Sequence, residues 1–234
     1  MNDMRLGTII DISLVDVPGI PVTVIFTAGC NFDCPYCQNA ELIPLDSGHE
    51  RTPEQIAKEA QGHLTDGYCI TGGEPTIYGD LPELLRLLAV DEEKHINLNT
   101  QGSVPRILEQ SMPYLDSVWL DFKTIPEKYQ EIARTRRDPW PKVEESINML
   151  LDSDVAFWPR TTYVGTLMTP DDIAGIMEAL SRMGFKGSYL VQNYRASDGT
   201  RPDEVKGFTA PAVEELESAV ASPPTGIEIR LEWR

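Results

Sequence analysis

The most constraining feature of this sequence is a repeated alternation between short apolar runs and helix-like segments. The runs lie at residues 22–27, 68–71, 96–99, 117–121, 154–163 and 188–192. Strands that alternate with helices usually join through right-handed βαβ crossovers, so the pattern predicts a parallel sheet. Six such units fall short of the eight in a closed barrel. We therefore predict an α/β fold, a curved and partly open (β/α)6 barrel of the TIM type.

The length of 234 residues suits one domain, because single α/β domains often reach roughly 200–250 residues. We find no low-complexity segment or linker that divides the chain. We predict a single domain over residues 1–234, with a core over about 6–195. A short C-terminal extension, about 196–234, contains a predicted helix at 210–220 and an alternating strand at 227–233.

Composition excludes some classes of partner. The net charge is −17, from 37 acidic and 20 basic residues, which argues against a broad phosphate-binding surface and therefore against nucleic acid. No run approaches the roughly 18 apolar residues of a membrane span, and the N-terminus lacks the pattern of a signal peptide. We expect a cytoplasmic protein that has neither a nucleic-acid nor a membrane partner.

Polar residues recur where the predicted strands end. They are the cysteines within residues 30–37, Gly72-Gly73-Glu74, Asn99-Thr100, Asp121 with Lys123, Arg160, and residues 192–195. In parallel barrels the carboxyl ends of the strands face one mouth, where the chemistry takes place. The sequence therefore predicts that these residues share a functional site.

The three cysteines in this set are Cys30, Cys34 and Cys37, spaced C-x3-C-x2-C directly after the first apolar run. Three thiolates can hold three irons of a four-iron cluster, whereas such clusters usually use four cysteines, so one iron is left open. A zinc site with a borrowed fourth ligand, a disulfide with a spare thiol, and three unrelated thiols remain alternatives. Cys69, in a separate strand-like segment, is predicted to be a buried core thiol.

Two motifs together resemble those of the radical S-adenosylmethionine (radical SAM) superfamily. The first is Cys30-x3-Cys34-x2-Cys37 with Tyr36 just before the last cysteine, and the second is Gly72-Gly73-Glu74-Pro75. The resemblance implies a partial (β/α)6 barrel of the radical SAM type. It also implies a 4Fe-4S cluster held by the three cysteines, with S-adenosylmethionine (SAM) at the open iron.

Further segments resemble the activating enzymes of glycyl-radical proteins. They are residues 13–19, 29–39, 98–105, 120–123, 126–129, 160–162 and 190–192, so the resemblance spans roughly 6–195. The subgroup that the chain most resembles is the short activating protein of anaerobic ribonucleoside-triphosphate reductase. The last forty or so residues add little to it.

The resemblance implies a reaction. The reduced cluster would give one electron to the sulfonium of SAM, and the resulting 5′-deoxyadenosyl radical would take a hydrogen from a glycine of a partner protein. The implied partners are a glycyl-radical protein and a one-electron donor such as flavodoxin or ferredoxin. The cofactors would supply the difficult chemistry, and the protein would supply position and exclusion of water.

The resemblance also assigns roles to residues near the first two strand ends, and each has an alternative. Gly72 and Gly73 can let the backbone approach a ligand closely, or form an ordinary tight turn. Glu74 can accept a hydrogen bond from the methionine ammonium of SAM, or be a solvated loop carboxylate, and the family makes much of this contact through backbone. Tyr36 can lie near the adenine, or belong to the core.

Later strand ends supply the remaining candidates. Asp121 and Lys123 alternate along a strand end and can point to the same face. The resemblance implies that both contact SAM, as does Thr100, and a surface ion pair is the alternative. Arg160 can pair with the methionine carboxylate in a bidentate geometry, or form a strand-end salt bridge.

Three places depart from the family pattern. Asn99 stands where the activating enzymes carry an aspartate, which weakens any monovalent cation site because hard cations prefer charged oxygens. Gln38 stands where a histidine usually follows the third cysteine. A histidine that contacts SAM is also missing after the sixth strand, where Gln192 or Arg195 can substitute.

Three functional hypotheses follow. The first is a radical SAM activating enzyme for a glycyl-radical protein, most specifically anaerobic ribonucleotide reductase. The second keeps the radical SAM chemistry but acts on a small molecule or on a different peptide or protein. The third is a non-enzymatic iron–sulfur carrier or structural zinc protein, although carriers normally ligate every iron.

Overall fold

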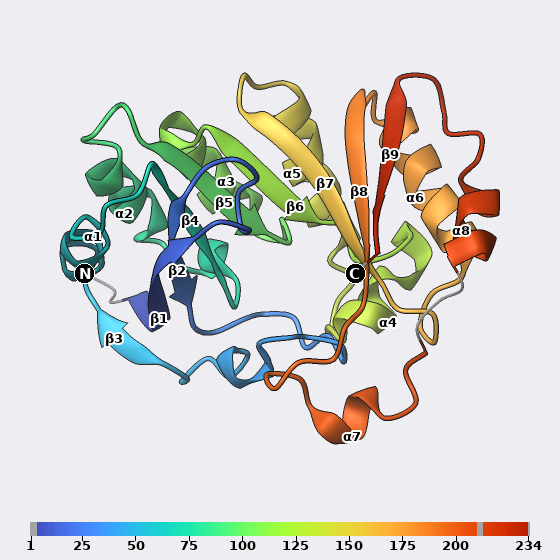
Figure 1. The fold of residues 1–234 in the computed structure, drawn as a ribbon, viewed down its shortest axis with the longest axis horizontal. Coiled ribbons are helices and arrows are strands. Elements are labelled where there is room, and N and C mark those ends of the chain that lie inside the picture. The colour runs from blue at the N-terminus through green and yellow to red at the C-terminus, as the bar shows by residue number, and fades with distance from the viewer. Residues whose placement is uncertain (1–3, 210–212, 234) are drawn as a thin grey trace. The chain divides into compact units, whose positions relative to one another are not determined.

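The computed structural model describes residues 4–209 and 213–233, and its ribbon is drawn in Figure 1. The chain forms two compact units, each built from three segments. Unit 1 comprises Met1–Asn31, Glu41–Trp119 and Lys142–Phe157, and unit 2 comprises Phe32–Ala40, Leu120–Pro141 and Trp158–Arg234. The boundary after Asn31 assigns Cys30 to unit 1 and both Cys34 and Cys37 to unit 2.

Unit 1 is organised by strands β1 (Met4–Ser13), β2 (Val22–Thr27), β3 (His49–Arg51), β4 (Gly67–Gly72) and β5 (His95–Thr100). β2, β4 and β5 are parallel, and β2 meets β4 in a register that pairs Thr27 with Gly72. β1 is antiparallel to both β2 and β3. Five of the six residues of β2 are buried, as expected of a strand covered on both faces.

The helices of unit 1 form where the sequence supplies caps and apolar faces. They are α1 (Pro53–Ala60), α2 (Leu81–Leu88) and α3 (Pro105–Ser111), with 3-10 turns η2 (Pro75–Ile77) and η3 (Met112–Tyr114). Thr52 and Gln55 form the capping box expected at the start of α1. α2 buries four of its five leucines and packs against both α1 and α3 (Figure 1).

Unit 2 contains β8 (Gly187–Asn193) and β9 (Ile227–Glu232), which run parallel to each other and to the end of β7. Its helices are α4 (Tyr129–Ala133), α6 (Pro170–Arg182), α7 (Pro202–Val205) and α8 (Val213–Ala219), with η4 (Pro126–Lys128) before α4. α6 packs against α8 (Figure 1). Thr169 and Asp172 cap the start of α6, and Gly184 follows its end with a φ of 88°.

Some elements begin in one unit and end in the other. They are η1 (Ala40–Leu42), β6 (Ser117–Asp121), α5 (Trp140–Leu151) and β7 (Ala156–Tyr163). Over the described residues, the strand order of the sheet is β3-β1-β2-β4-β5-β6-β7-β8-β9. The six predicted parallel strands are β2 and β4–β8, and β1, β3 and β9 add to them.

The predicted α/β class with a mostly parallel sheet is confirmed. The helix predicted at 210–220 is observed as α8, and residues 210–212 lie outside the described part of the chain. The single-domain organisation remains a prediction. No helix within the described ranges has the length and apolar character needed to cross a membrane.

Candidate active site

Gly72, which ends β4, and Gly73 lie against the backbone that leads into the cysteine loop, residues 30–37. The Gly73 amide donates to the Thr27 carbonyl at 2.8 Å, and the Glu74 amide donates to the Gly29 carbonyl at 2.8 Å. A Cβ on Gly73 would lie 2.1 Å from the Gly29 oxygen, and one on Gly72 would lie 2.2 Å from the Thr27 oxygen. Both positions therefore require glycine, and the close approach that they allow is first of all to the chain itself.

The start of the cysteine loop is held within unit 1. The Cys30 amide donates to the Ile43 carbonyl at 3.0 Å. The next side chain, Asn31, accepts from Gln101 Nε2 at 2.8 Å and donates to Ser103 Oγ at 2.7 Å. Sequence reasoning did not single out Gln101 or Ser103, because their partner lies about seventy residues earlier in the chain.

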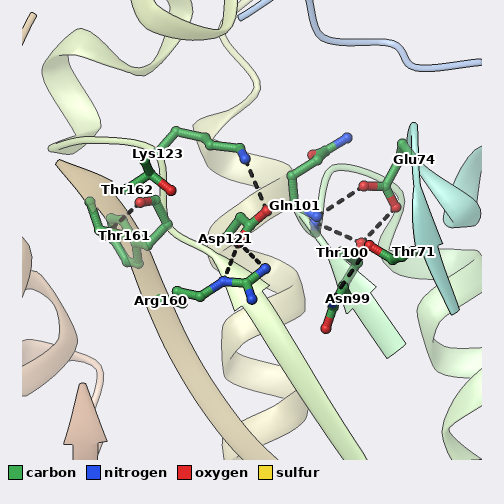
Figure 2. A network of polar contacts seen from close by, with 12 residues as sticks. Thr71, Glu74, Asn99, Thr100, Gln101, Asp121, Lys123, Arg160, Thr161 and Thr162 are labelled. Carbon is green, nitrogen blue, oxygen red and sulfur yellow. Dashed lines mark hydrogen bonds and ion pairs between the residues drawn. The ribbon is translucent and has the colours of Figure 1, made fainter. Parts of the chain in front are cut away.

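The Glu74 carboxylate is buried and receives its hydrogen bonds from the protein (Figure 2). Oε1 accepts from the Thr76 amide at 3.0 Å, from the Thr76 hydroxyl, and from the Thr100 hydroxyl at 2.6 Å. Oε2 accepts from the Gln101 amide at 2.9 Å. Burial raises the pKa of Glu74, and the bonds from Gln101, Thr100 and Thr76 oppose that rise.

These contacts change what Glu74 and Thr100 can offer a ligand. The Thr100 hydroxyl donates to Glu74 and accepts from the Gly102 amide at 3.0 Å. The carboxylate thus ties the loop after β4 to the end of β5.

A buried row of neutral polar groups follows β4 and β5. Asn99 accepts from Asn97 Nδ2 at 2.9 Å and donates to Thr71 Oγ1 at 3.4 Å. Asn97 also donates to Cys69 Sγ at 3.4 Å, and Cys69 is fully buried, as predicted. The departure at Asn99 therefore places an amide, engaged with other neutral groups, where the resembling family carries a carboxylate.

In unit 2, Asp121 lies between two cations (Figure 2). Lys123 Nζ is 3.0 Å from Asp121 Oδ2, while Arg160 Nε and Nη2 lie 2.9 and 2.8 Å from Oδ1. Burial alone would raise the pKa of Asp121, but Arg160 and Lys123 outweigh it and hold the pKa at about 2. Burial acts to lower the pKa of Lys123, but the charge of Asp121 raises it well above the usual value. Asp121 and Lys123 therefore both carry their charges at neutral pH.

The second part of the cysteine loop also belongs to unit 2. Cys34 and Tyr36 are buried, Cys37 is partly exposed, and the Cys37 amide donates to the Cys34 carbonyl at 3.2 Å. Burial raises the pKa of the Cys34 thiol to about 11, against the effect of the Lys123 charge, which favours the thiolate. The buried Tyr36 hydroxyl has no hydrogen-bond partner among the described residues.

The segment after β8 contacts the same loop. Gln38 Nε2 donates to the Arg195 carbonyl at 2.8 Å, while the Arg195 side chain is exposed. Arg201 Nη2 lies 2.5 Å from Asp33 Oδ1 and 3.2 Å from the Cys34 carbonyl. Sequence reasoning missed Arg201, since no local pattern signals a contact across 168 positions.

The donor chemistry fits an iron–sulfur cluster. Cysteine thiolates are the usual ligands of such clusters, and three of them come from one eight-residue loop. The orphaned Tyr36 hydroxyl is a buried donor that a ligand beside this loop can satisfy. In residues 4–209 and 213–233, no three His, Cys, Asp or Glu side chains are arranged as a ready metal site.

The comparisons with known proteins give the class. The family model of the radical SAM superfamily matches residues 24–182, which is more than half of the chain. The chain therefore belongs to the radical SAM superfamily, and it is an enzyme of the radical SAM type. This family uses SAM and a 4Fe-4S cluster.

Two relatives with known names show which members of the superfamily the chain is similar to. A protein of Methanocaldococcus jannaschii, provisionally named a glycyl-radical enzyme activating enzyme, is 29% identical over 213 residues, covering 89% of this chain and 87% of the relative. The pyruvate formate-lyase-activating enzyme of Listeria monocytogenes is 24% identical over 194 residues, covering 76% of this chain and 77% of its own.

A solved structure confirms the predicted fold class. The crystal structure of Streptococcus suis SuiB bound to S-adenosylmethionine superposes with a TM-score of 0.66 at 14% identity. The match covers 89% of this chain, which spans about half (49%) of SuiB. At this level of identity the likeness concerns the fold alone.

Proposed function

We propose that this chain is an activating enzyme that generates a glycyl radical on a partner protein, specifically on anaerobic ribonucleotide reductase. The observation that carries the proposal is the near full-length likeness to the M. jannaschii relative, which covers 89% of this chain. The Listeria relative, which is named for the same kind of reaction, supports it. A flavodoxin or ferredoxin would supply the electron.

Cys30, Cys34 and Cys37 would hold three irons of the cluster and leave one iron open for SAM. When bound, the cluster would supply the electron for reductive cleavage of SAM, which starts hydrogen abstraction from the glycine. The burial of Cys34 and Tyr36 supports this assignment, because it shields the Cys34 thiol from water and oxidants, while Cys30 and Cys37 are partly exposed.

The remaining candidates divide by what each can donate. The backbone of Gly72, Gly73 and Glu74 would contact the methionine end of SAM, since the buried Glu74 carboxylate already accepts four hydrogen bonds from the protein. Lys123 and Arg160 carry positive charge that can attract the methionine carboxylate, while Asp121 fixes their orientation.

Two more residues complete the proposed SAM site. The unpartnered Tyr36 hydroxyl would donate to the adenosine portion. Arg195, whose side chain is exposed, would contact SAM from the segment after β8.

An anaerobic assay tests the proposal directly. The protein is reconstituted with iron and sulfide, then mixed with SAM, a reductant and the candidate ribonucleotide reductase. We expect a glycyl EPR doublet from the wild type and from Cys69→Ser, and none from Cys34→Ser. SAM cleavage without a doublet on any co-occurring glycyl-radical protein would refute the activating function while leaving the radical SAM chemistry intact.

The neutral Asn99 and Gln38 favour a second candidate, because each replaces a residue that the activating enzymes commonly carry. In this case the same site would act on a small molecule or on another peptide. Reductive cleavage of SAM that is stimulated by a small metabolite, and not by a glycyl-radical protein, would support it.

A further inference from the structure

Arg201 joins the segment after β8 to the cysteine loop. Its Nη2 lies 2.5 Å from Asp33 Oδ1 and 3.2 Å from the carbonyl oxygen of Cys34. Its Nη1 lies 3.1 Å from Glu204 Oε1. One planar guanidinium thus contacts three acceptors, two of which belong to the cysteine loop, and a lysine ammonium cannot reproduce that fork.

Glu204 is held from a second side by Arg134. The two guanidinium nitrogens of Arg134 lie 2.7 and 2.6 Å from the two carboxylate oxygens of Glu204, a bidentate pair. Arg134 caps α4 with a φ of 50° and is the only non-glycine residue with positive φ in the described ranges. Such a conformation costs free energy and persists where the surrounding contacts hold it.

Backbone hydrogen bonds join the same segments as the ion pairs of Arg201, Glu204 and Arg134. The Asp33 amide donates to the carbonyl of Ala133, the residue before Arg134, at 2.9 Å. The Ala40 amide, on the far side of the loop, donates to the Gly199 carbonyl at 2.8 Å. All of these residues belong to unit 2, so the contacts are internal to one compact body.

We propose that Arg201, Glu204 and Arg134 form a clamp that positions the cysteine loop to receive its iron–sulfur cluster. Arg201 is the positioning residue: it fixes the Asp33 side chain and the Cys34 carbonyl, and Glu204 with Arg134 fixes Arg201. The inference rests on the proposed role of Cys30, Cys34 and Cys37 as cluster ligands. It gives a function to residues 196–205, which sequence analysis left without one.

The buried Nε atom of Arg201 supports this role, although the side chain as a whole is 32% exposed. This Nε atom has no hydrogen-bond partner among the described residues. The partly exposed ion pair between Arg201 and Asp33 would stabilise the fold only a little by itself. The contacts of the two terminal guanidinium nitrogens therefore offset the cost of leaving Nε without a partner. Here those contacts converge on the peptide that carries Cys34.

The first test uses the protein without its cluster. The variants are Arg201→Ala, Arg201→Lys and Asp33→Asn, and the control is Arg230→Ala, which removes an exposed arginine of β9 that pairs with Glu228. Alkylation of each cysteine by iodoacetamide is followed by mass spectrometry. We expect Cys34 to react about tenfold faster in Arg201→Ala, equivalent to about 1.4 kcal/mol of local opening.

Cys69 is the internal reference, because it is fully buried in β4 of unit 1. The clamp predicts that Cys69 keeps its wild-type rate in all variants and that Arg201→Lys is intermediate. Equal acceleration of Cys34 and Cys69 would indicate general destabilisation and overturn the proposal. So would an unchanged Cys34 rate in both Arg201→Ala and Asp33→Asn.

The second test follows the reconstituted protein in air. We expect the visible absorbance of the cluster to bleach severalfold faster in Arg201→Ala than in wild type or Arg230→Ala. If the wild type takes up no cluster, the proposed function fails, while the alkylation result still decides whether the clamp exists. Normal cluster lifetime in a variant whose Cys34 is alkylated faster would show that the clamp does not serve the cluster.

Discussion

The Asp121 carboxylate allows a quantitative test of how much its ion pairs with Lys123 and Arg160 stabilise the fold. Its folded-state pKa is about 2, against an ordinary value of 3.8, because Arg160 and Lys123 hold it ionised. At about 1.36 kcal/mol per pH unit, the difference of 1.8 units corresponds to about 2 kcal/mol of stability at neutral pH. The side chain is 29% exposed, so solvent screens this interaction only in part.

The sign of the pH dependence follows from the lowered pKa. The stabilisation is fully present above pH 3.8 and is lost as the pH falls through about 2, with about half remaining near pH 3. Asp121→Asn removes it at every pH and takes away the carboxylate that Arg160 and Lys123, each less than a fifth exposed, share. We expect the variant to be less stable by about 2–4 kcal/mol at pH 7.

Urea denaturation of the cluster-free protein at pH 7, 4 and 3 measures this difference. Other carboxylates titrate in the same range, so the relevant quantity is wild type minus Asp121→Asn at each pH. We expect that difference to be similar at pH 7 and pH 4 and to shrink by about 1 kcal/mol at pH 3. A difference below about 0.5 kcal/mol at pH 7, or one that does not change with pH, would refute the electrostatic account.

Three further predictions concern the other candidate residues. Gly73→Ala should lower the free energy of unfolding by about 1–3 kcal/mol, because the added Cβ meets the Gly29 carbonyl. The control Gly79→Ala should not lower it, because a Cβ there meets no atom within 4 Å. Thermal denaturation compares the two variants, and equal effects would contradict the packing argument. Glu74→Gln should cost about 1–3 kcal/mol in the same assay, by turning an amide toward the Gln101 N–H. Burial raises the pKa of Glu74 above 4.5, so wild-type stability should fall as the pH rises from about 4.5 through that pKa; a slope that survives in Glu74→Gln would exclude Glu74 as its source. Tyr36→Phe should leave the stability of the cluster-free protein unchanged or slightly higher, because the hydroxyl has no hydrogen-bond partner among the described residues. It should weaken the binding of SAM to the reconstituted protein, as measured by calorimetry. An unchanged affinity would exclude Tyr36 as a ligand contact.

Local pattern was sufficient for the main elements of the sheet. Residues 22–27 and 117–121 form strands with the predicted bounds, because each contains a short apolar stretch that is mostly buried in the sheet. β3 was missed, since its three residues are polar and exposed and it exists only by pairing with β1. α7, four residues long, is likewise too short to leave a periodic signal.

The candidate site was predictable as a set of positions but not as a set of contacts. Sequence alone indicated Asp121, Lys123 and Arg160, because strand ends and alternation place them. It could not show that the Glu74 carboxylate accepts hydrogen bonds from Thr100 and Gln101, because these contacts depend on the register between β4 and β5. Arg201 was invisible for the same reason, as its partner Asp33 lies far away along the chain.

The bond between Arg201 and Asp33 also has a consequence for the order of events during synthesis. The two residues are separated by 168 positions, and a ribosome adding about 5–20 residues per second needs roughly 8–35 s to cover them. For that interval the thiols of Cys34 and Cys37 sit on a nascent segment without its final support. If iron and sulfide arrived before the chain left the ribosome, the cysteine loop would not yet have its folded conformation. We therefore expect iron and sulfide to be loaded onto finished chains.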